Sequence, residues 1–361
     1  MKTETKRVKG FKYRIYPTPV QKEVLEYNFN ATRSAFNYLL DKAIKEYEAW
    51  KKDPENLSKP KCSGYDFSKQ LPIMKAEPEL AWLKEASSNA LQQKTLDLGK
   101  AFSNFFRDKK GYPNFKSMHA NQSIRLTGNA FRLKDNEFYI AKLDTPIQVK
   151  WSRMLPDKPS SATVSRNTAG QYFVSFVCEY IPAPTNGQTI SGIDLTIENL
   201  AVRIKTDEDT IIIDNPQHYV KKQRKLAKLQ RKLAKKQKGS KNREKAKVKV
   251  AKLHRSIANQ RLDYLHKLST KLVRENQAIC LEDKSLIPQC RDEETSKNTH
   301  DAGWGMFKQM LTYKAEDSSW CRVLLARPVD VETDKAEEFR RLTIEHREKT
   351  WEDQPGKVIP I

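Results

Sequence analysis

Two short apolar runs in the chain each end in a carboxylate, and this feature limits the folds that the sequence can adopt. The first run, Ile190 to Leu195, carries Asp194 near its end, and the second, Ala278 to Leu281, is followed by Glu282. Their apolar and β-branched residues predict buried strands. Because an isolated buried charge is unfavourable, each strand either ends in solvent or presents its acid to a metal ion.

If the two strands are neighbours, Asp194 and Glu282 converge although 88 residues separate them in the sequence. Nearby carboxylates are tolerated where they share divalent cations. This layout is that of an RNase H-like nuclease, in which two metal ions activate water and stabilise the leaving oxygen. The residues alone leave both interpretations open, because an acid at the end of a strand is also typical of a solvated end.

The charge of the chain predicts a polyanionic partner. Its 361 residues contain 67 Lys and Arg against 45 Asp and Glu, a formal net charge of +22, and such an excess favours nucleic acid. Apolar residues are spread along the whole chain, so we expect a folded protein. We expect no membrane partner, because no apolar run approaches the length of a membrane span and the N-terminus lacks a signal-peptide core. The expected location is the cytoplasm, with association to the nucleoid through DNA.

The most basic segment runs from Lys221 to Arg261 and holds 18 Lys and Arg with one acid, Glu244. Leucines at helical spacing and the break "KKQKGSKN" predict two helices joined as a hairpin. A charged face exposed to solvent is one interpretation. Contact with a phosphate backbone is the other, and it is favoured because so many like charges repel one another in a free hairpin.

The rest of the chain divides by its hydrophobic period. The stretch "KGFKYRIYP" alternates as a strand, Thr18 and Pro19 open a helical block that extends to about residue 108, and short alternating runs then return. One of these, "ATVSRNTAGQYFVSFVCEYI", predicts a hairpin with Gly170 at its tip. The simplest assembly pairs the first strand with these later strands, so that a helical block interrupts a β module.

The ordered motifs resemble the TnpB (OrfB) family of insertion-sequence proteins. The matching stretches run from residue 7 to about 316, namely "YRIYPTPVQ", "ATRSAFNYLL", "AFSNFF" with "GYPNFK", "GIDLTIENLAV", "KGSKNREKAKVKVAKLH", "NQRLDYLHKLS", "CLEDKSL" and "DAGWGMFKQMLTYKAE". The resemblance implies an RNA-guided protein that binds double-stranded DNA. The implied fold is α+β and multidomain: a wedge-like β-barrel (1–16 and 117–185), an inserted helical recognition lobe (17–116), a RuvC-like domain of RNase H fold with the basic hairpin (186–316) and a divergent tail (317–361).

The same resemblance assigns roles to residues. It places Asp194 and Glu282 at the first and second catalytic acids. Residues that recognise a short motif beside the DNA target correspond to Asn89 and Gln92 in "NALQQ", and to Tyr65. Asn and Gln can read adenine edges, although polar residues on an exposed helix face are the alternative. The guide RNA and the heteroduplex would be bound through their backbones by Lys12, Arg14, Lys221, Lys222, Arg224, Lys225, Lys228, Arg231, Lys232, Lys235, Lys241 and Arg243.

The chain departs from the family after "YKAE". Family members continue into a zinc ribbon with two C-x-x-C pairs and then supply a third catalytic acid, whereas no two of the five cysteines here lie within four residues of each other. We therefore expect no zinc. Asp334 is the one candidate for the third acid, without the Asn and Ala pattern that surrounds it in relatives. Mg²⁺ is the metal that such a site would take, and we expect it not to be bound productively.

This pattern is similar to TldR proteins, which are TnpB-like, nuclease-dead repressors. We therefore expect a degenerate RuvC-like nuclease that binds a guide RNA and a DNA target with an adjacent short motif and represses transcription. Two alternatives stay open: an active RNA-guided endonuclease of a transposon, and a basic nucleic-acid-binding protein with no guide.

Overall fold

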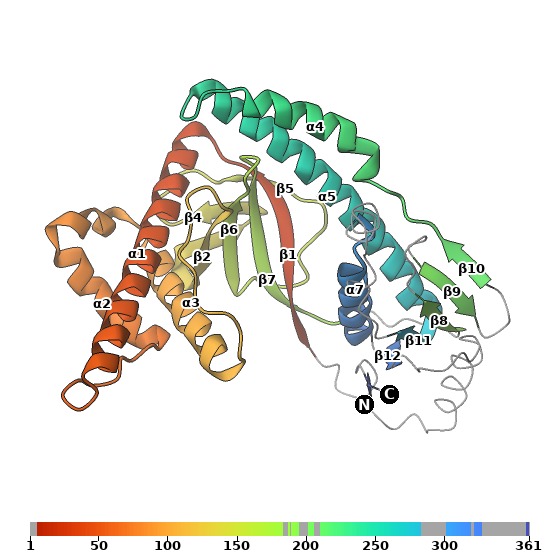
Figure 1. The fold of residues 1–361 in the computed structure, drawn as a ribbon, viewed down its shortest axis with the longest axis horizontal. Coiled ribbons are helices and arrows are strands. Elements are labelled where there is room, and N and C mark those ends of the chain that lie inside the picture. Colours follow the sequence, from red (N-terminus) through yellow and green to blue (C-terminus); the bar gives the residue numbers. More distant parts are fainter. Residues whose placement is uncertain are drawn as a thin grey trace. The chain divides into compact units, whose positions relative to one another are not determined.

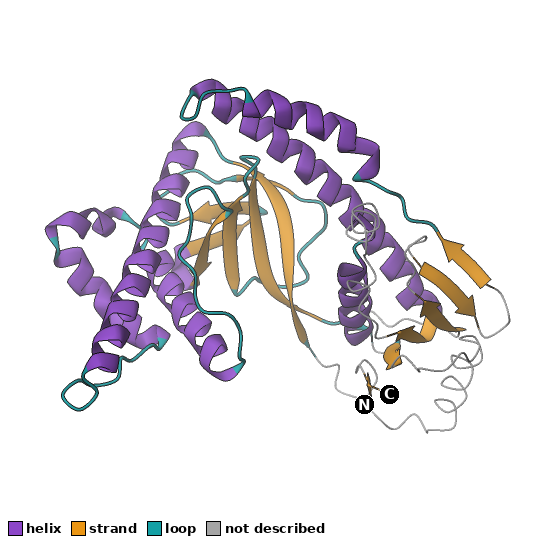
Figure 2. Ribbon diagram, viewed as in Figure 1, coloured by secondary structure: helices purple, strands orange, loops and turns teal. Residues whose placement is uncertain are grey.

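The computed structural model divides the chain into two compact units, residues 1–180 and 181–361. The structure describes residues 6–182, 187, 189–194, 201–205, 210–282, 301–318, 321–326 and 359–360. Figure 1 labels the elements along the chain and Figure 2 separates helices from strands. Each unit combines a sheet with helices, so the fold is α/β mixed in both halves of the chain.

The helices of the first unit lie where the sequence period predicts them. They are α1 (Pro19–Lys52), α2 (Gly64–Ala76), the 3-10 helix η1 (Pro78–Glu85) and α3 (Ser88–Arg107). The Thr18 hydroxyl accepts a hydrogen bond from the Gln21 backbone N–H, and the Gln21 side chain accepts one from Thr18 N–H, which is a capping box. Pro19 at the first helical position completes the expected start of α1.

The first strand pairs with strands from much later in the chain, as expected. Five strands form one sheet in the order β2-β6-β7-β1-β5. Their bounds are β1 (Arg7–Tyr16), β2 (Gln122–Thr127), β5 (Gln148–Lys150), β6 (Ser161–Arg166) and β7 (Tyr172–Tyr180). The β6–β7 hairpin turns at Gly170, whose φ of +73° suits glycine. A short 3-10 turn, η2 (Gly128–Ala130), leads into a separate hairpin of β3 (Phe131–Lys134) and β4 (Glu137–Ile140).

The hydrogen-bonded order of the large sheet begins at β2 and ends at β5, so the described strands form an open sheet, whereas the family resemblance implies a wedge-like β-barrel. Its inner face carries Tyr13, Ile15, Val174 and Phe176, which are all buried. Leu25 and Phe29 of α1 pack into the same core. The inserted helices therefore share a core with the sheet, and a second cluster holds α1, α2 and α3 together.

The second unit contains a six-stranded sheet in the order β10-β9-β8-β11-β12-β13. The strands are β8 (Thr189–Asp194), β9 (Ala201–Lys205), β10 (Thr210–Ile213), β11 (Asn276–Glu282), β12 (Arg322–Ala326) and β13 (Ile359–Pro360). The first three are antiparallel, and β11 and β12 then add in parallel. This mixed order is consistent with the RuvC-like sheet of RNase H fold expected from the sequence.

One strand of this sheet comes from the segment expected to be a divergent tail. β12 pairs in parallel with β11 along its full length, from Ala278↔Arg322 to Glu282↔Ala326. Cys321 and Val323 are buried in the same core as Ile279. The sheet of the second unit thus continues past residue 316, because this apolar segment covers an edge of β11 that would otherwise leave its backbone groups unpaired.

Three helices accompany the sheet of the second unit among the described residues: α4 (Val220–Ala234), α5 (Lys241–Glu275) and α7 (Trp304–Asp317). α4 and α5 run side by side as the expected hairpin (Figure 1). Leu265 and Leu272 of α5 and Phe307 and Leu311 of α7 enter the core beside β11. Within the described part of the chain, none of the helices has the length and apolar character needed to cross a membrane.

Candidate nucleic-acid interface and strand-end acids

The structure brings the two strand-end acids to adjacent positions at the same end of two neighbouring strands. Asp194 is the last residue of β8 and Glu282 is the last residue of β11. The two strands are parallel neighbours, and Ile193 pairs with Leu281 immediately before the acids. The backbone therefore places both acids at the carboxyl ends of adjacent parallel strands. The side chains of Asp194 and Glu282 lie outside the described residues, and so does Asp334.

A buried polar contact fixes the register of these two strands. The Ser191 hydroxyl lies 2.7 Å from Oδ1 of Asn276, and Nδ2 of Asn276 donates to the Leu272 carbonyl at 2.7 Å. Ser191 and Asn276 are 1% and 0% exposed. A shift of one residue between β8 and β11 would turn every side chain of the shifted strand to the other face of the sheet. This contact therefore fixes the alignment of Asp194 with Glu282 at the carboxyl ends of the two strands.

The backbone also packs closely beside Asn276, at the start of β11. A Cβ placed on Gly187 would lie 2.5 Å from the backbone nitrogen of Asn276, so no larger residue fits without movement. Sequence reasoning missed this support, although polar Ser191 and Asn276 inside apolar strands could have indicated it. Carboxylates are ligands that Mg²⁺ takes, so the pair of acids suits the ion. No cluster of three or more His, Cys, Asp or Glu occurs within the ranges that the structure describes.

The basic hairpin presents most of its predicted backbone-binding side chains to solvent. α4 has seven Lys and Arg and no acid. The exposed members are Lys221, Arg224, Lys225, Lys228, Arg231, Lys232, Lys235 and Lys241. α4 thus presents positive charge with no acid in its own sequence, which is suited to a phosphate backbone.

Two of the predicted backbone-binding residues have partners inside the hairpin. Nη1 of Arg243 donates to the carbonyls of Leu233 and Lys236, at 3.2 and 2.7 Å, and so closes the turn between the helices. The Lys222 ammonium donates to Ser256 and Gln260 of α5. Lys222 and Arg243 therefore shape the basic surface as well as adding charge to it.

The first strand adds a second basic surface, on the outward face of the sheet of the first unit. The Lys12 ammonium lies 4.7 Å from the centre of the Phe173 ring, and the Arg14 guanidinium lies 4.9 Å from it. Cation–π contacts of this kind hold the two side chains on the sheet surface. The registers align Lys12 with Ser175, Ser175 with Thr163 and Thr163 with Arg125. A row of polar side chains therefore crosses four strands, which sequence reasoning did not foresee.

The three residues predicted to read the DNA motif differ in their surroundings. Asn89 is engaged with β2, since its Oδ1 accepts from Thr127 N–H at 3.0 Å and its Nδ2 donates to the Thr127 hydroxyl at 3.1 Å. Gln92 is exposed, and its amide makes no hydrogen bond within the described residues. Tyr65 is 69% exposed beneath the Lys69 ammonium, which lies 4.6 Å from its ring centre.

Tyr65 and Gln92 both flank the contact between α2 and α3. Gly64 packs against the backbone of Leu96, and Ser68 and Thr95 share a hydroxyl–hydroxyl hydrogen bond of 2.6 Å. Gln92 lies one helical turn before Leu96 on α3. The structure therefore leaves Tyr65 and Gln92 available to a partner at this contact, and uses Asn89 to join α3 to the sheet.

The chain matches known proteins over both units. Residues 171–284 match the OrfB/IS605 family model described as "Probable transposase", and residues 7–52 match one described as "Helix-turn-helix domain". In this structure residues 7–52 form β1 and the single long helix α1. A solved structure titled "Cryo-EM structure of the Cas12f1-sgRNA-target DNA complex" aligns over 89% of each chain at 11% identity, with a TM-score of 0.45.

Two curated relatives cover most of the chain. The "Putative RNA-guided DNA endonuclease" of Streptomyces pristinaespiralis is 38% identical over 311 residues, which span 85% of this chain and 74% of the relative. The "Putative RNA-guided DNA endonuclease InsQ" of Escherichia coli K12 is 28% identical over 86% of this chain and 78% of the relative. Together with the family model, these matches show that the chain belongs to the TnpB (OrfB) family of IS605-type insertion-sequence proteins.

Proposed function

We propose that the chain is an RNA-guided DNA-binding protein that lacks nuclease activity and represses transcription by occupying its target. Membership of the TnpB family supports the guided binding, because its curated relatives are named as RNA-guided DNA endonucleases. The exposed Lys and Arg side chains of α4, together with the surface formed by Lys12 and Arg14, supply the positive charge that binding of an RNA and a heteroduplex requires. Tyr65 and Gln92 are the candidates for reading a motif beside the target.

The loss of cleavage rests on one observation: the sequence that follows β12 has neither zinc-ribbon cysteine pairs nor the third-acid motif of the family. Two-metal hydrolysis needs ligands that hold both ions a few ångströms apart. Asp194 and Glu282 supply two of these, and the third would have to come from a segment that has lost the scaffold positioning it in relatives. Misplacement by about 1 Å is enough to lower the rate roughly a hundredfold.

An active endonuclease is the second candidate, and the placement of the acids favours it. Asp194 and Glu282 end adjacent parallel strands whose register is fixed by Ser191 and Asn276. A working nuclease site would need both acids at the carboxyl ends of these two strands.

One assay separates the two functions. RNA that copurifies with the chain is sequenced, and the complex is incubated with matching duplex DNA in Mg²⁺ or Mn²⁺. We expect binding that requires the guide sequence, and no cleavage. Cleavage that disappears in Asp194→Ala would establish the endonuclease instead, and binding that ignores the guide sequence would establish an unguided basic protein.

A further inference from the structure

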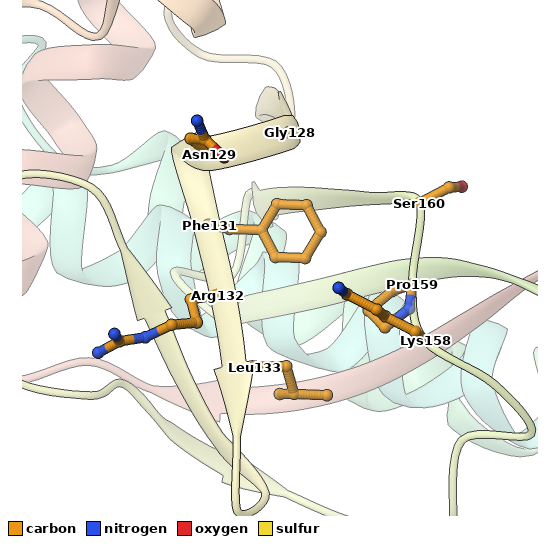
Figure 3. Close-up of a pocket in the computed structure, with 8 residues that line it drawn as sticks. All are labelled: Gly128, Asn129, Phe131, Arg132, Leu133, Lys158, Pro159 and Ser160. Atoms are coloured by element: carbon orange, nitrogen blue, oxygen red, sulfur yellow. The ribbon is translucent and has the colours of Figure 1, made fainter.

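A cavity of about 560 Å³ opens on the surface of the first unit beside the β3–β4 hairpin. One wall is formed by η2 and β3 and the other by residues 158–160, just before β6. Its volume lies within the roughly 300–1,000 Å³ typical of sites for small organic groups, and is far too small for a nucleic-acid duplex. Figure 3 shows the side chains that line it.

The cavity has an aromatic floor that the core holds in place. Phe131 and Leu133 extend from the same face of β3 toward Lys158 and Pro159 (Figure 3). The Phe131 ring lies 6.4 Å, centre to centre, from each of the rings of Phe138 and Phe176, and both of those are fully buried. Phe131 itself is only partly buried. One side of its ring is therefore backed by the core, and the ring still presents surface to the cavity.

Polar groups at the rim are free to bind. The Asn129 amide makes no hydrogen bond, and the Lys158 ammonium has no ion pair, within the described part of the chain. Ser160 is held by Val177, whose carbonyl accepts from its backbone N–H at 2.8 Å and from its hydroxyl at 3.2 Å. The one acid nearby in sequence, Asp157, accepts the backbone N–H of Lys158.

The opposite face of the hairpin is arranged differently. Arg132 is one of the residues that line the cavity, but its side chain extends from the other side of β3 than Phe131 and Leu133 (Figure 3), and its guanidinium lies 4.8 Å from the centre of the Tyr139 ring. Tyr139 pairs with Arg132 in the register of β3 and β4, so its ring also belongs to that face. The stacking surface of Phe131 is thus on the cavity side, and a second aromatic ring of the same hairpin is outside it.

We propose that this cavity takes an unstacked nucleobase, with the phosphate next to it held by Lys158. A flat ring with one open side is a stacking partner for any base. The Asn129 amide can both donate to and accept from a base edge, and the Lys158 ammonium suits a phosphate oxygen. The Lys12 and Arg14 surface of the same unit offers positive charge to the backbone of the strand, and the cavity adds a site for one extruded base. This inference rests on the proposed nucleic-acid binding, and the base comes from the guide RNA or from the DNA target.

Site-specific photocrosslinking tests the proposal on the full chain. Two complexes are prepared, one with 4-thiouridine in the RNA and the other with 4-thiothymidine in the DNA, and crosslinked peptides are mapped by mass spectrometry. We expect a crosslink to residues 128–133 or 158–160 in one of the two complexes, which also identifies the source of the base. Normal nucleic-acid binding with no crosslink to these residues in either complex would overturn the proposal.

Matched variants of the hairpin make the test sharper. Phe131→Leu removes the stacking ring, and Tyr139→Leu removes a ring from the opposite face. Loss of one base stack corresponds to roughly a 5- to 150-fold fall in the equilibrium constant for seating the base, so the crosslink should fall by up to that factor in Phe131→Leu and persist in Tyr139→Leu. Equal losses in the two variants would overturn the proposal.

A rim variant separates the cavity from a folding defect and from the proposed function. Asn129→Ala leaves the floor intact, and we expect a melting temperature like that of the native chain with a weaker crosslink; an unchanged crosslink would remove Asn129 from the site. A chain that takes up no RNA and no DNA at all would reject the proposed function together with the cavity. Strong binding through other segments only would reject the cavity alone.

Discussion

Ser191 on β8 and Asn276 on β11 form a buried hydrogen bond, 2.7 Å between Oγ and Oδ1, at the point where the two strands enter the sheet. Asn276 also donates to the carbonyl of Leu272 at the end of α5. A single amide therefore joins the preceding helix, its own strand and the parallel neighbour. This contact lies at the opposite end of the strands from Asp194 and Glu282, and fixes their alignment.

Asn276→Ala should lower the free energy of unfolding by about 1–3 kcal/mol, because it removes the buried amide that bonds the Ser191 hydroxyl and one of the two donors to the Leu272 carbonyl. Denaturant unfolding of the full chain measures the change. Asn242→Ala, at an exposed position of α5, is the matched control and should have little effect. Equal stabilities of the two variants would show that the contact does not hold the strands.

Gly99→Ala should destabilise the first unit, because its Cβ would lie 2.0 Å from the backbone nitrogen of Gly64 where α2 crosses α3. Overpacking of this kind is typically destabilising by about 1–3 kcal/mol. Gly305→Ala in α7 is the control, since its Cβ meets nothing within 4 Å and alanine favours the helix by roughly 0.5–1 kcal/mol. Thermal melts of the two variants should therefore shift in opposite directions, and a melt of Gly99→Ala like that of the native chain would contradict the close crossing.

The periodic parts of this fold could be predicted from the sequence. The capping residues Thr18 and Gln21 mark the start of α1, and Gly170 marks the β6–β7 turn, because local chemistry decides both. The residues alone gave the adjacency of β8 and β11 only as the condition for Asp194 and Glu282 to converge, and the parallel register now shows that the two strands are neighbours.

Features that depend on tertiary contacts could not be read in the same way. β12 lies in the tail that diverges from the family because it lacks the zinc ribbon and the third-acid motif, yet its apolar residues extend the sheet beside β11. Asn89 matched a base-reading motif, but whether its amide faces a partner or Thr127 depends on where β2 packs. The cavity beside Phe131 joins residues about 30 apart in sequence, and no local pattern encodes it.

His218 should make the second unit less stable in mild acid. Burial lowers the pKa of its imidazole below the ordinary value of 6.5; nearby Asp301 opposes this shift, and Lys221, Arg261 and Lys222 add to it. The unfolded chain then binds a proton at a higher pH than the folded chain does, so the free energy of unfolding falls as the pH drops through about 6.5 toward the lower folded pKa. Above that window the contribution is fully present.

Denaturant midpoints measured between pH 5 and 8 test this, with His218→Gln expected to flatten the fall below pH 6.5. His254→Gln, at an exposed position of α5, is the control for the loss of one imidazole. A fall of the same size in His218→Gln and in the native chain would assign the acid sensitivity to other groups.

Truncation should show that β12 is needed for the fold of the second unit. A chain of residues 1–320 lacks Cys321, Val323 and the rest of the strand, which are buried against β11, so that strand would be left with an unpaired edge and an open core. We expect this chain to lose the cooperative unfolding of the second unit. A chain of residues 1–327 keeps β12 and gives up β13, which adds two registered pairs, and it should fold and bind nucleic acid as the full chain does.

The Cys321 thiol provides a local readout of β12. Burial raises its pKa to about 12, so the thiol is protonated and shielded when the strand is in place. In the full chain and in residues 1–327, Cys321 should react slowly with a thiol reagent under native conditions and rapidly after denaturation, as identified by peptide mapping. Rapid native labelling of Cys321, or normal unfolding of residues 1–320, would show that β12 is dispensable. If 1–327 binds guided DNA with full affinity, the residues after β12 are not needed for binding, whatever they contribute to cleavage.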